Sequence, residues 1–418
     1  MFVMFYFLFL IIIGLPILTM EFSVGRASKK SPAMAFKTLE KPGHKWHLHG
    51  YTSLIGNYLL VMFYSTVSGW MLYYFYLSLK GSFVGATSEA IKETFSNMTA
   101  NPETMLLWMA IVVVIGIAVC AIGLQKGIEK ISKVMMLLLL GIIIILAVNS
   151  ILMDGSGEGL SFYLLPNVER MMEIGVVKTI VAAMNQAFFT LSLGIGSMAI
   201  FGSYIGKEKS LLGESVNIVV LDTFVAVASG LIIFPACFSF GVSPDSGPDL
   251  IFLTLPNIFA NMSGGRIWGS LFFLFMSFAA LTTIIAVFEN IISCVMDTFN
   301  ISRKKACFIN LFLIIALSLP CVYGFGPFSQ KLLSFLGEGS TVLDFESFIV
   351  EAVLLPLGSL IFLLFCVSRY GWGFKNYMDE VNQGEGLKMK KWMQGYLTYI
   401  LPFIVIFIFL FGIYDKFF

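Results

Sequence analysis

Long apolar segments separated by short polar loops make up almost the whole chain. A helix of about 20 apolar residues is long enough to cross the hydrocarbon core of a bilayer. Ten segments approach or exceed that length, so the pattern predicts an all-α, polytopic membrane protein with a single transmembrane domain over residues 1–418. The predicted spans are 1–24, 51–79, 104–123, 134–153, 176–205, 216–240, 267–296, 306–324, 348–368 and 396–414.

The centre of the fifth span, 176–205, is unlike that of a plain spanning helix. Thr190, Ser192, Gly194 and Gly196 lie close together there. Each glycine weakens a helix by about 1 kcal/mol relative to alanine, so this centre indicates a helix that breaks at mid-depth. Broken backbone is tolerated there only beside protein or a cavity, and half-helix ends suit a cation or a carboxylate. The alternative is a face of small residues for helix packing.

Basic residues are concentrated in alternate loops, which hold 19 of the 26 Lys and Arg. The positive-inside rule places these loops in the cytoplasm, and ten spans then put both termini outside. An outside N-terminus that begins directly in an apolar span is difficult to insert. We therefore expect the natural start to lie upstream, with one span missing. The basic loops include 25–50, 124–133, 206–215, 297–305 and 369–395.

Composition agrees with a membrane protein and narrows the candidate chemistry. The chain is 58% hydrophobic and 12% charged, and its net charge of +1, without a basic domain, gives no indication of a nucleic-acid partner. The six cysteines are scattered without a Cys-x-x-Cys motif, so they are expected to be buried thiols. Three histidines share the 25–50 loop, either as a metal site or as solvated side chains. The second interpretation is favoured because no acid or cysteine nearby completes a ligand set.

Polar side chains inside the spans are the candidate functional residues, because such residues are costly in a membrane. Asp222 has no basic residue nearby, so a bound cation is its expected partner, with a protonated carboxyl as the alternative. Glu21 is an interfacial charge or a structural pin. Thr282 and Thr283 either bond back to their own helix or offer oxygens to a small cation. Tyr64 is a packed aromatic residue or a substrate donor.

Several short motifs occur in one order along the whole chain. They are Gly14-Leu-Pro with Glu21-Phe and Gly25-Arg26, Gly127-Ile-Glu-Lys-Ile-Ser-Lys133, Gln186-Ala-Phe-Phe-Thr-Leu-Ser-Leu-Gly194, Leu221-Asp-Thr223 with Gly230 and Phe234-Pro235, Leu255-Pro-Asn with Phe259, and Leu281-Thr-Thr283. Together they resemble the neurotransmitter:sodium symporters, most closely the prokaryotic amino-acid branch with the LeuT fold.

The resemblance implies two inverted repeats of five helices, with substrate and sodium between broken helices one and six. Counted in that way, the chain begins at the second helix, which accounts for its N-terminus. Residues 1–153 would be the remainder of the first repeat and 174–368 the second. Residues 369–418 would form a cytoplasmic loop and an additional C-terminal helix.

The resemblance also implies roles for individual residues. Thr190 and Asp222 would bind the first sodium ion, and Thr282, Thr283 and the carbonyl of Ala279 the second. Tyr64 would contact the substrate carboxylate and close the outer gate with Phe189. Glu21 would hold the unwound segment around Gly194 and Gly196 through its backbone amides. The side-chain pocket would be lined by Leu60, Ser192, Ile195 and Val287.

Three departures from the family pattern affect these roles. The missing helix would supply half of each sodium site and most of the carboxylate cradle. The outer-gate acid falls at Ser347, with Asp344 a turn earlier. A proline that the family often uses to unwind its fifth helix is replaced by Leu137.

The leading hypothesis is sodium-coupled symport of a small amino acid across the plasma membrane, with sodium ions as co-transported ligands and no cofactor. The alternative is a truncated homologue that acts as a receptor or scaffold and does not transport. An enzyme is not expected because no nucleophile–base pair or phosphate loop is visible. A channel is not expected because no filter-like repeat occurs.

Overall fold

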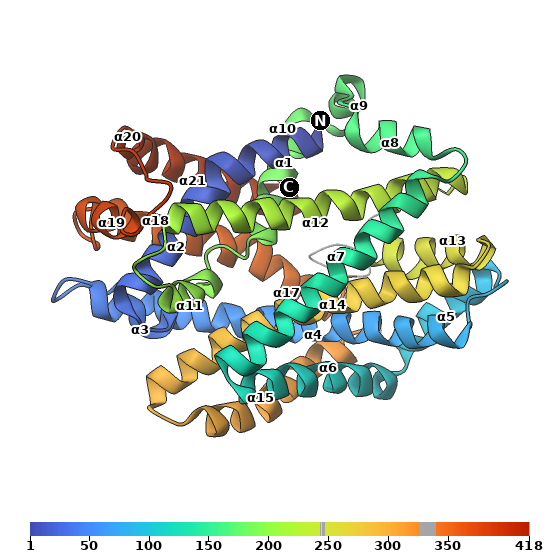
Figure 1. The fold of residues 1–418 in the computed structure, drawn as a ribbon, viewed down its shortest axis with the longest axis horizontal. Coiled ribbons are helices and arrows are strands. Elements are labelled where there is room, and N and C mark those ends of the chain that lie inside the picture. Colours follow the sequence, from blue (N-terminus) through green and yellow to red (C-terminus); the bar gives the residue numbers. More distant parts are fainter. Residues whose placement is uncertain (243, 245–246, 326–339, 418) are drawn as a thin grey trace.

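The computed structural model describes residues 1–242, 244, 247–325 and 340–417. These residues form an assembly of helices (Figure 1). Eight of the helices are long and apolar enough to cross a membrane, and each coincides with a predicted span. They are Phe2–Ser28, Pro102–Ile122, Gly127–Ile151, Leu211–Ser239, Gly265–Phe299, Arg303–Tyr323, Val342–Val367 and Met393–Tyr414.

The other two predicted spans differ from these eight for physical reasons. Helix α4 (Leu48–Lys80) has 33 residues but is less apolar, because it carries polar side chains that are buried against neighbouring helices rather than facing lipid. The segment 176–205 forms two helices, α10 (Val176–Thr190) and α11 (Ser197–Tyr204), joined by the non-helical residues 191–196. The predicted break at mid-span is therefore confirmed.

Four π-helical turns each precede a Leu–Pro pair. Proline has no backbone N–H and its ring crowds the preceding turn, so the local hydrogen-bond ladder widens. The pairs begin at Leu15, Leu255, Leu355 and Leu401. The segments concerned are α1 (Phe2–Phe9), η1 (Leu10–Gly14) and α2 (Leu15–Ser28); η3 (Leu250–Thr254) and α13 (Leu255–Asn261); α17 (Val342–Phe348), η5 (Ile349–Leu354) and α18 (Leu355–Val367); and η6 (Tyr396–Ile400) and α21 (Leu401–Phe417).

The predicted basic loops gather on one face of the molecule, which we call the basic face. Helices α3 (Pro32–Leu39), α11 and α19 (Phe374–Val381) lie at that end in Figure 1. Lys41 Nζ donates to the carbonyl of Arg369 at 2.7 Å, and the amide of Ser31 donates to Asp297 Oδ2 at 2.8 Å. Short helices cover the opposite face: α5 (Ser88–Ala100), α8 (Ser156–Leu164), α9 (Val168–Ile174) and α13.

Two expectations about side chains are corrected here. His49 is not a solvated loop residue, because it is buried in α4 against the rings of Phe36 and Phe362. An acid does lie near the histidines, since His47 Nδ1 is 2.6 Å from Glu40 Oε1. All six cysteines are buried and free, as predicted.

Helices α4, α6 (Pro102–Ile122), α7 (Lys130–Ile151), α12 (Leu211–Ser239), α14 (Gly265–Phe299) and α15 (Arg303–Tyr323) pack against one another. Of the broken helix, α10 packs against α1 and α21, and α11 packs against α2 and α14. Packing is especially close between α2 and α11. A Cβ on Gly25 would lie 1.8 Å from the carbonyl oxygen of Ala199, and one on Gly202 would lie 2.5 Å from that of Phe22. Backbone therefore touches backbone, as small residues allow between membrane helices.

Candidate functional site

The break between α10 and α11 depends on left-handed backbone conformations. Ser192, Gly194 and Gly196 have φ values of 49°, 93° and 71°. A Cβ on Gly194 would lie 2.2 Å from the carbonyl oxygen of Leu355, and one on Gly196 would lie 2.7 Å from Pro32 Cβ. Glycine at these two positions is thus required by both conformation and space.

Side chains from three other helices satisfy the exposed backbone of the break. Glu21, fully buried in α2, accepts a hydrogen bond from the amide of Gly194. Asn57 Nδ2 in α4 donates to the carbonyl of Ile195 at 2.7 Å, and Asn290 Nδ2 in α14 donates to the same oxygen at 3.5 Å. Sequence reasoning missed both asparagines, although an amide in the middle of an apolar span was the available signal.

A cavity of about 220 Å³ lies beside the break. It is lined by eight of the residues predicted for the substrate and sodium sites, and by three that were not predicted. The eight are Leu60, Tyr64, Phe189, Thr190, Ser192, Ile195, Asp222 and Thr283, and the additional three are Gln186, Val350 and Leu355. Val350 and Leu355 reach the cavity from either end of the π turn η5, a feature that no short sequence pattern identified.

Asp222 supplies the carboxylate in this lining. Thr190 Oγ1, at the end of α10, donates a hydrogen bond of 2.8 Å to Asp222 Oδ2 in α12. Among residues 1–242, 244, 247–325 and 340–417, no lysine or arginine forms an ion pair with it. The arrangement leaves a half-buried carboxyl group with a hydroxyl but without a positively charged partner.

The threonine pair in α14 bonds back to its own helix. Thr282 Oγ1 donates to the carbonyl of Ala279 at 2.9 Å and Thr283 Oγ1 donates to the same oxygen at 3.2 Å. Three oxygen atoms therefore lie together, and only Thr283 also lines the cavity.

Two of the other predicted site residues lie outside the cavity lining. Val287 is 2% exposed and packs in the core of α14. Asp344 caps α17, where its Oδ2 accepts hydrogen bonds of 2.8 Å from both the amide and the hydroxyl of Thr341. Ser347, in the position expected for the outer-gate acid, donates instead to Glu351 Oε1 at 2.7 Å.

A cluster of three polar side chains joins α11 to α14 and α15. Arg303 Nη1 and Nη2 in α15 lie 2.6 and 2.8 Å from the two carboxylate oxygens of the buried Glu289 in α14. The phenol of Tyr204, the last residue of α11, donates to Glu289 Oε1 at 2.7 Å. The end of the broken helix on the basic face is therefore held against α14.

Comparison with known proteins agrees with this architecture. The sequence profile of the sodium:neurotransmitter symporter family matches residues 1–104 and 86–416. The chain is 32% identical over 405 residues to the uncharacterized sodium-dependent transporter YhdH of Bacillus subtilis, covering 96% of this chain and 87% of the relative. It is 24% identical to the sodium-dependent serotonin transporter of Drosophila melanogaster, covering 98% of this chain and 71% of the relative.

Among solved structures, the chain is similar to MhsT, crystallised in complex with L-phenylalanine. The TM-score is 0.85 at 34% sequence identity, and the match covers 98% of this chain and 90% of that chain. The predicted fold class is confirmed by this similarity. The predicted missing first helix and the division into repeats stay predictions.

Proposed function

Because the chain belongs to the sodium:neurotransmitter symporter family, a family of transporters and not of enzymes, we propose that it carries a small amino acid across the plasma membrane together with sodium ions. The observation that supports this most directly is the cavity beside the broken helix, with Asp222 in its lining. A carboxylate without a positive partner at that depth is costly, and a co-transported cation removes the cost.

The first sodium ion would bind to Asp222 and Thr190. Thr190 Oγ1 already donates to Asp222 Oδ2, so the two oxygens are close enough to share one cation. Half-helix ends with exposed carbonyls are common sodium sites in transporters, and Thr190 is the last residue of α10. Asp222 would also provide a permanent negative charge beside the ion.

The second sodium ion would bind to Ala279, Thr282 and Thr283. Each hydroxyl uses its hydrogen to bond the carbonyl of Ala279, which leaves the lone pairs of both hydroxyl oxygens available. Back-bonding and cation binding are therefore compatible. The ion would therefore bind all three oxygens without a change in the conformation of α14.

The substrate would lie between the two ions, with its carboxylate toward Tyr64 and its side chain toward apolar residues. The similar protein MhsT was crystallised with L-phenylalanine, which supports an amino acid as the substrate class. Ser192, held at positive φ in the break, would contact the substrate directly. The side-chain pocket would be formed by Leu60, Phe189 and Ile195, without the predicted Val287, which lies outside the cavity lining.

Transport would follow from alternating exposure of this cavity. The basic face would be the cytoplasmic face by the positive-inside rule, and the hydrogen bond from Tyr204 to Glu289 would help to close it. Sodium would bind the outward-facing state more tightly, so its inward gradient would drive the cycle. The proposed outer gate consists of Tyr64 and Phe189.

Uptake into proteoliposomes tests the proposal. A panel of radiolabelled amino acids is offered with an inward sodium gradient and, as the control, with potassium in place of sodium. We expect accumulation of at least one amino acid only with the sodium gradient. Sodium-dependent binding without accumulation would favour the receptor or scaffold alternative, and neither binding nor uptake across the panel would contradict an amino-acid substrate.

A further inference from the structure

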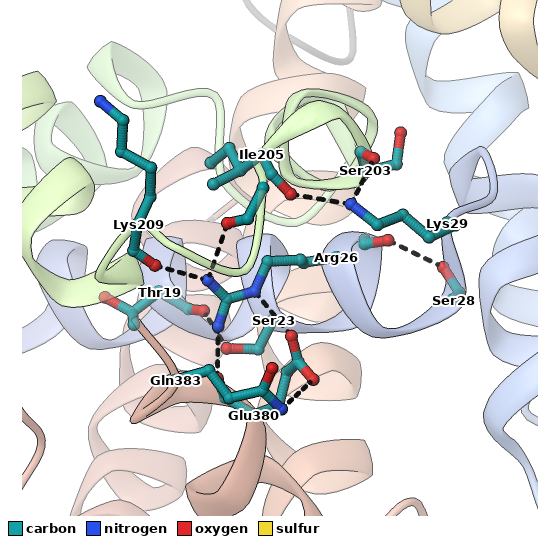
Figure 2. A network of polar contacts seen from close by, with 12 residues as sticks. Thr19, Ser23, Arg26, Ser28, Lys29, Ser203, Ile205, Lys209, Glu380 and Gln383 are labelled. Atoms are coloured by element: carbon teal, nitrogen blue, oxygen red, sulfur yellow. Dashed lines mark hydrogen bonds and ion pairs between the residues drawn. The ribbon is translucent and has the colours of Figure 1, made fainter. Parts of the chain in front are cut away.

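A fully buried arginine lies at the basic-face end of α2. Figure 2 shows Arg26 pointing away from its own helix toward α19 and toward the loop between α11 and α12. Its Nε lies 2.6 Å from Glu380 Oε1, and its Nη2 donates to the carbonyl of Glu380. Arg26 is 0% exposed and Glu380 is 7% exposed, so the ion pair is shielded from water.

The same guanidinium also holds the loop that follows the broken helix. Arg26 Nη1 donates to the carbonyl of Lys209 at 2.7 Å and to that of Gly206 at 3.4 Å. Directly after α2, Lys29 Nζ donates to the carbonyls of Ser203 and Ile205 at 3.1 and 2.7 Å (Figure 2). Positive side chains at the end of α2 thus bind the terminal carbonyls of α11 and the loop after it.

The two segments that Arg26 contacts also pair with each other. The amide of Glu385 donates to the carbonyl of Glu208 at 3.1 Å, and the hydroxyl of Ser210 donates to the carbonyl of Leu387. We call Arg26, Glu380 and the segments 203–210 and 382–387 the Arg26 clamp. It joins α2, α11 and α19, which come from three separate parts of the sequence.

The clamp differs from the contact on the other side of α11. If Tyr204 leaves Glu289, the carboxylate keeps both hydrogen bonds to Arg303, so no charge is left alone. If α19 leaves Arg26, a buried guanidinium loses its counter-ion, which is the costly way to break an ion pair. The backbone contacts of Gly25 and Gly202 likewise resist separation of α2 from α11. The boundary between α11 and α14 is therefore the easier one to open.

We propose that Arg26 is a positioning residue that fastens α19 to α2 and α11, so that α19 moves with the broken helix when the basic face opens along the boundary between α11 and α14. This inference rests on the proposed transport function, because that function requires the basic face to open. It assigns a mechanical task to the cytoplasmic segment 374–387, which contributes no residue to the cavity lining.

Spin-label distances measured on the full chain in lipid nanodiscs test the inference. Exposed positions for introduced cysteines are Lys207 in the α11–α12 loop, Asp379 in α19 and Lys304 in α15. The six native cysteines are buried, so the labels react with the introduced ones. On exchange of sodium for potassium, we expect the 207–304 distance to change and the 207–379 distance to stay constant. A 207–379 distance that changes as much as the 207–304 distance would overturn the inference.

Variants of the clamp provide the second arm. Arg26→Gln should broaden the 207–379 distance distribution. Arg26→Lys keeps the positive charge but lacks the planar guanidinium, so its distribution should be narrower than that of Arg26→Gln and broader than that of the unmodified chain. Lys37→Gln, at an exposed lysine of α3, is the matched control for loss of one positive charge and should match the unmodified chain. A narrow, unchanged distribution in Arg26→Gln would show that the residue does not fasten α19.

The two proposals fail in distinguishable ways. If neither distance responds to sodium, the transport proposal is contradicted, and the Arg26→Gln distribution still decides whether Arg26 holds α19. If Arg26→Gln does not fold, Glu380→Gln carries the same test, because it keeps the side-chain size and removes only the carboxylate charge. A 207–379 distribution in Glu380→Gln as narrow as in the unmodified chain would then reject the clamp.

Discussion

At the scale of single residues, the charge of Asp222 is the property on which ion coupling depends. Asp222→Asn keeps the size and the contact with Thr190 but removes the charge that would attract sodium. A charge-assisted contact contributes about 1.5–3 kcal/mol, so the sodium concentration for half-maximal uptake should rise about tenfold or more. Alternatively, uptake should require chloride, because a bound chloride ion would replace the lost negative charge. Sodium titrations with and without chloride measure this. Glu103→Gln, at an exposed acid of α6, is the control, and unchanged ion dependence in Asp222→Asn would remove Asp222 from the site.

Gly194 tests the geometry of the break at the same scale. Gly194→Ala places a Cβ 2.2 Å from a backbone oxygen and imposes a conformation that costs a non-glycine residue about 1–3 kcal/mol before any clash is counted. The midpoint of thermal unfolding in detergent should therefore fall clearly. Gly141→Ala in α7 is the control, because a Cβ there meets nothing within 4 Å and alanine favours the helix. Equal midpoints for the two variants would contradict the required role of Gly194.

At the scale of elements, sequence reasoning succeeded where local composition determines structure. The break in 176–205 was predictable because Gly194 and Gly196 weaken a helix wherever they occur. The back-bonding of Thr282 and Thr283 was predicted as an alternative, and it is present. The contact of Asp222 with Thr190, 32 residues away, depends on where α12 passes the end of α10, for which a motif shared with known proteins was the only guide.

The features that were missed come from packing between distant segments. The capping role of Asp344 was open to prediction, because Thr341 three residues earlier is a capping signal. The position of Val350 was not, because the π turn η5 alters which face of the helix meets the cavity. Leu–Pro pairs accompany four such turns, but Leu319–Pro320 lies within the continuous helix α15, so the pair alone does not predict a π turn.

The π turn leads to a prediction about substrate size. Val350→Ala removes two methyl groups from the cavity lining and should shift preference toward amino acids with larger side chains. Pocket changes of this size alter discrimination by about 10- to 200-fold. Competition by a panel of unlabelled amino acids against the preferred substrate measures the shift. Val148→Ala, at a lipid-facing position of α7, is the control, and an unchanged ranking in Val350→Ala would place the pocket elsewhere.

At the scale of the whole molecule, α11 lies between two clusters of polar side chains with different roles. On one side the Arg26 clamp joins it to α2 and α19, and on the other Tyr204 joins it to Glu289 and Arg303. Neither group was predictable as a unit, because each combines residues from helices far apart in sequence. Both lie on the basic face, whose closure the proposed cycle requires.

Tyr204→Phe tests this closure, because it removes one hydroxyl and leaves the Glu289–Arg303 pair intact. A hydrogen bond to a charged group contributes about 1.5–3 kcal/mol, so its loss should shift the population toward the inward-open state about tenfold or more. Because sodium binds the outward-facing state in the proposed cycle, its apparent affinity should fall as the outward-facing fraction falls, by at most the same factor, while the preferred amino acid is unchanged. The 207–304 distance distribution and a sodium titration of thermal stability measure the two effects. Phe201→Tyr, which adds a hydroxyl to α11 one turn earlier, is the control; a closed distance distribution in Tyr204→Phe would show that this contact does not hold the basic face shut.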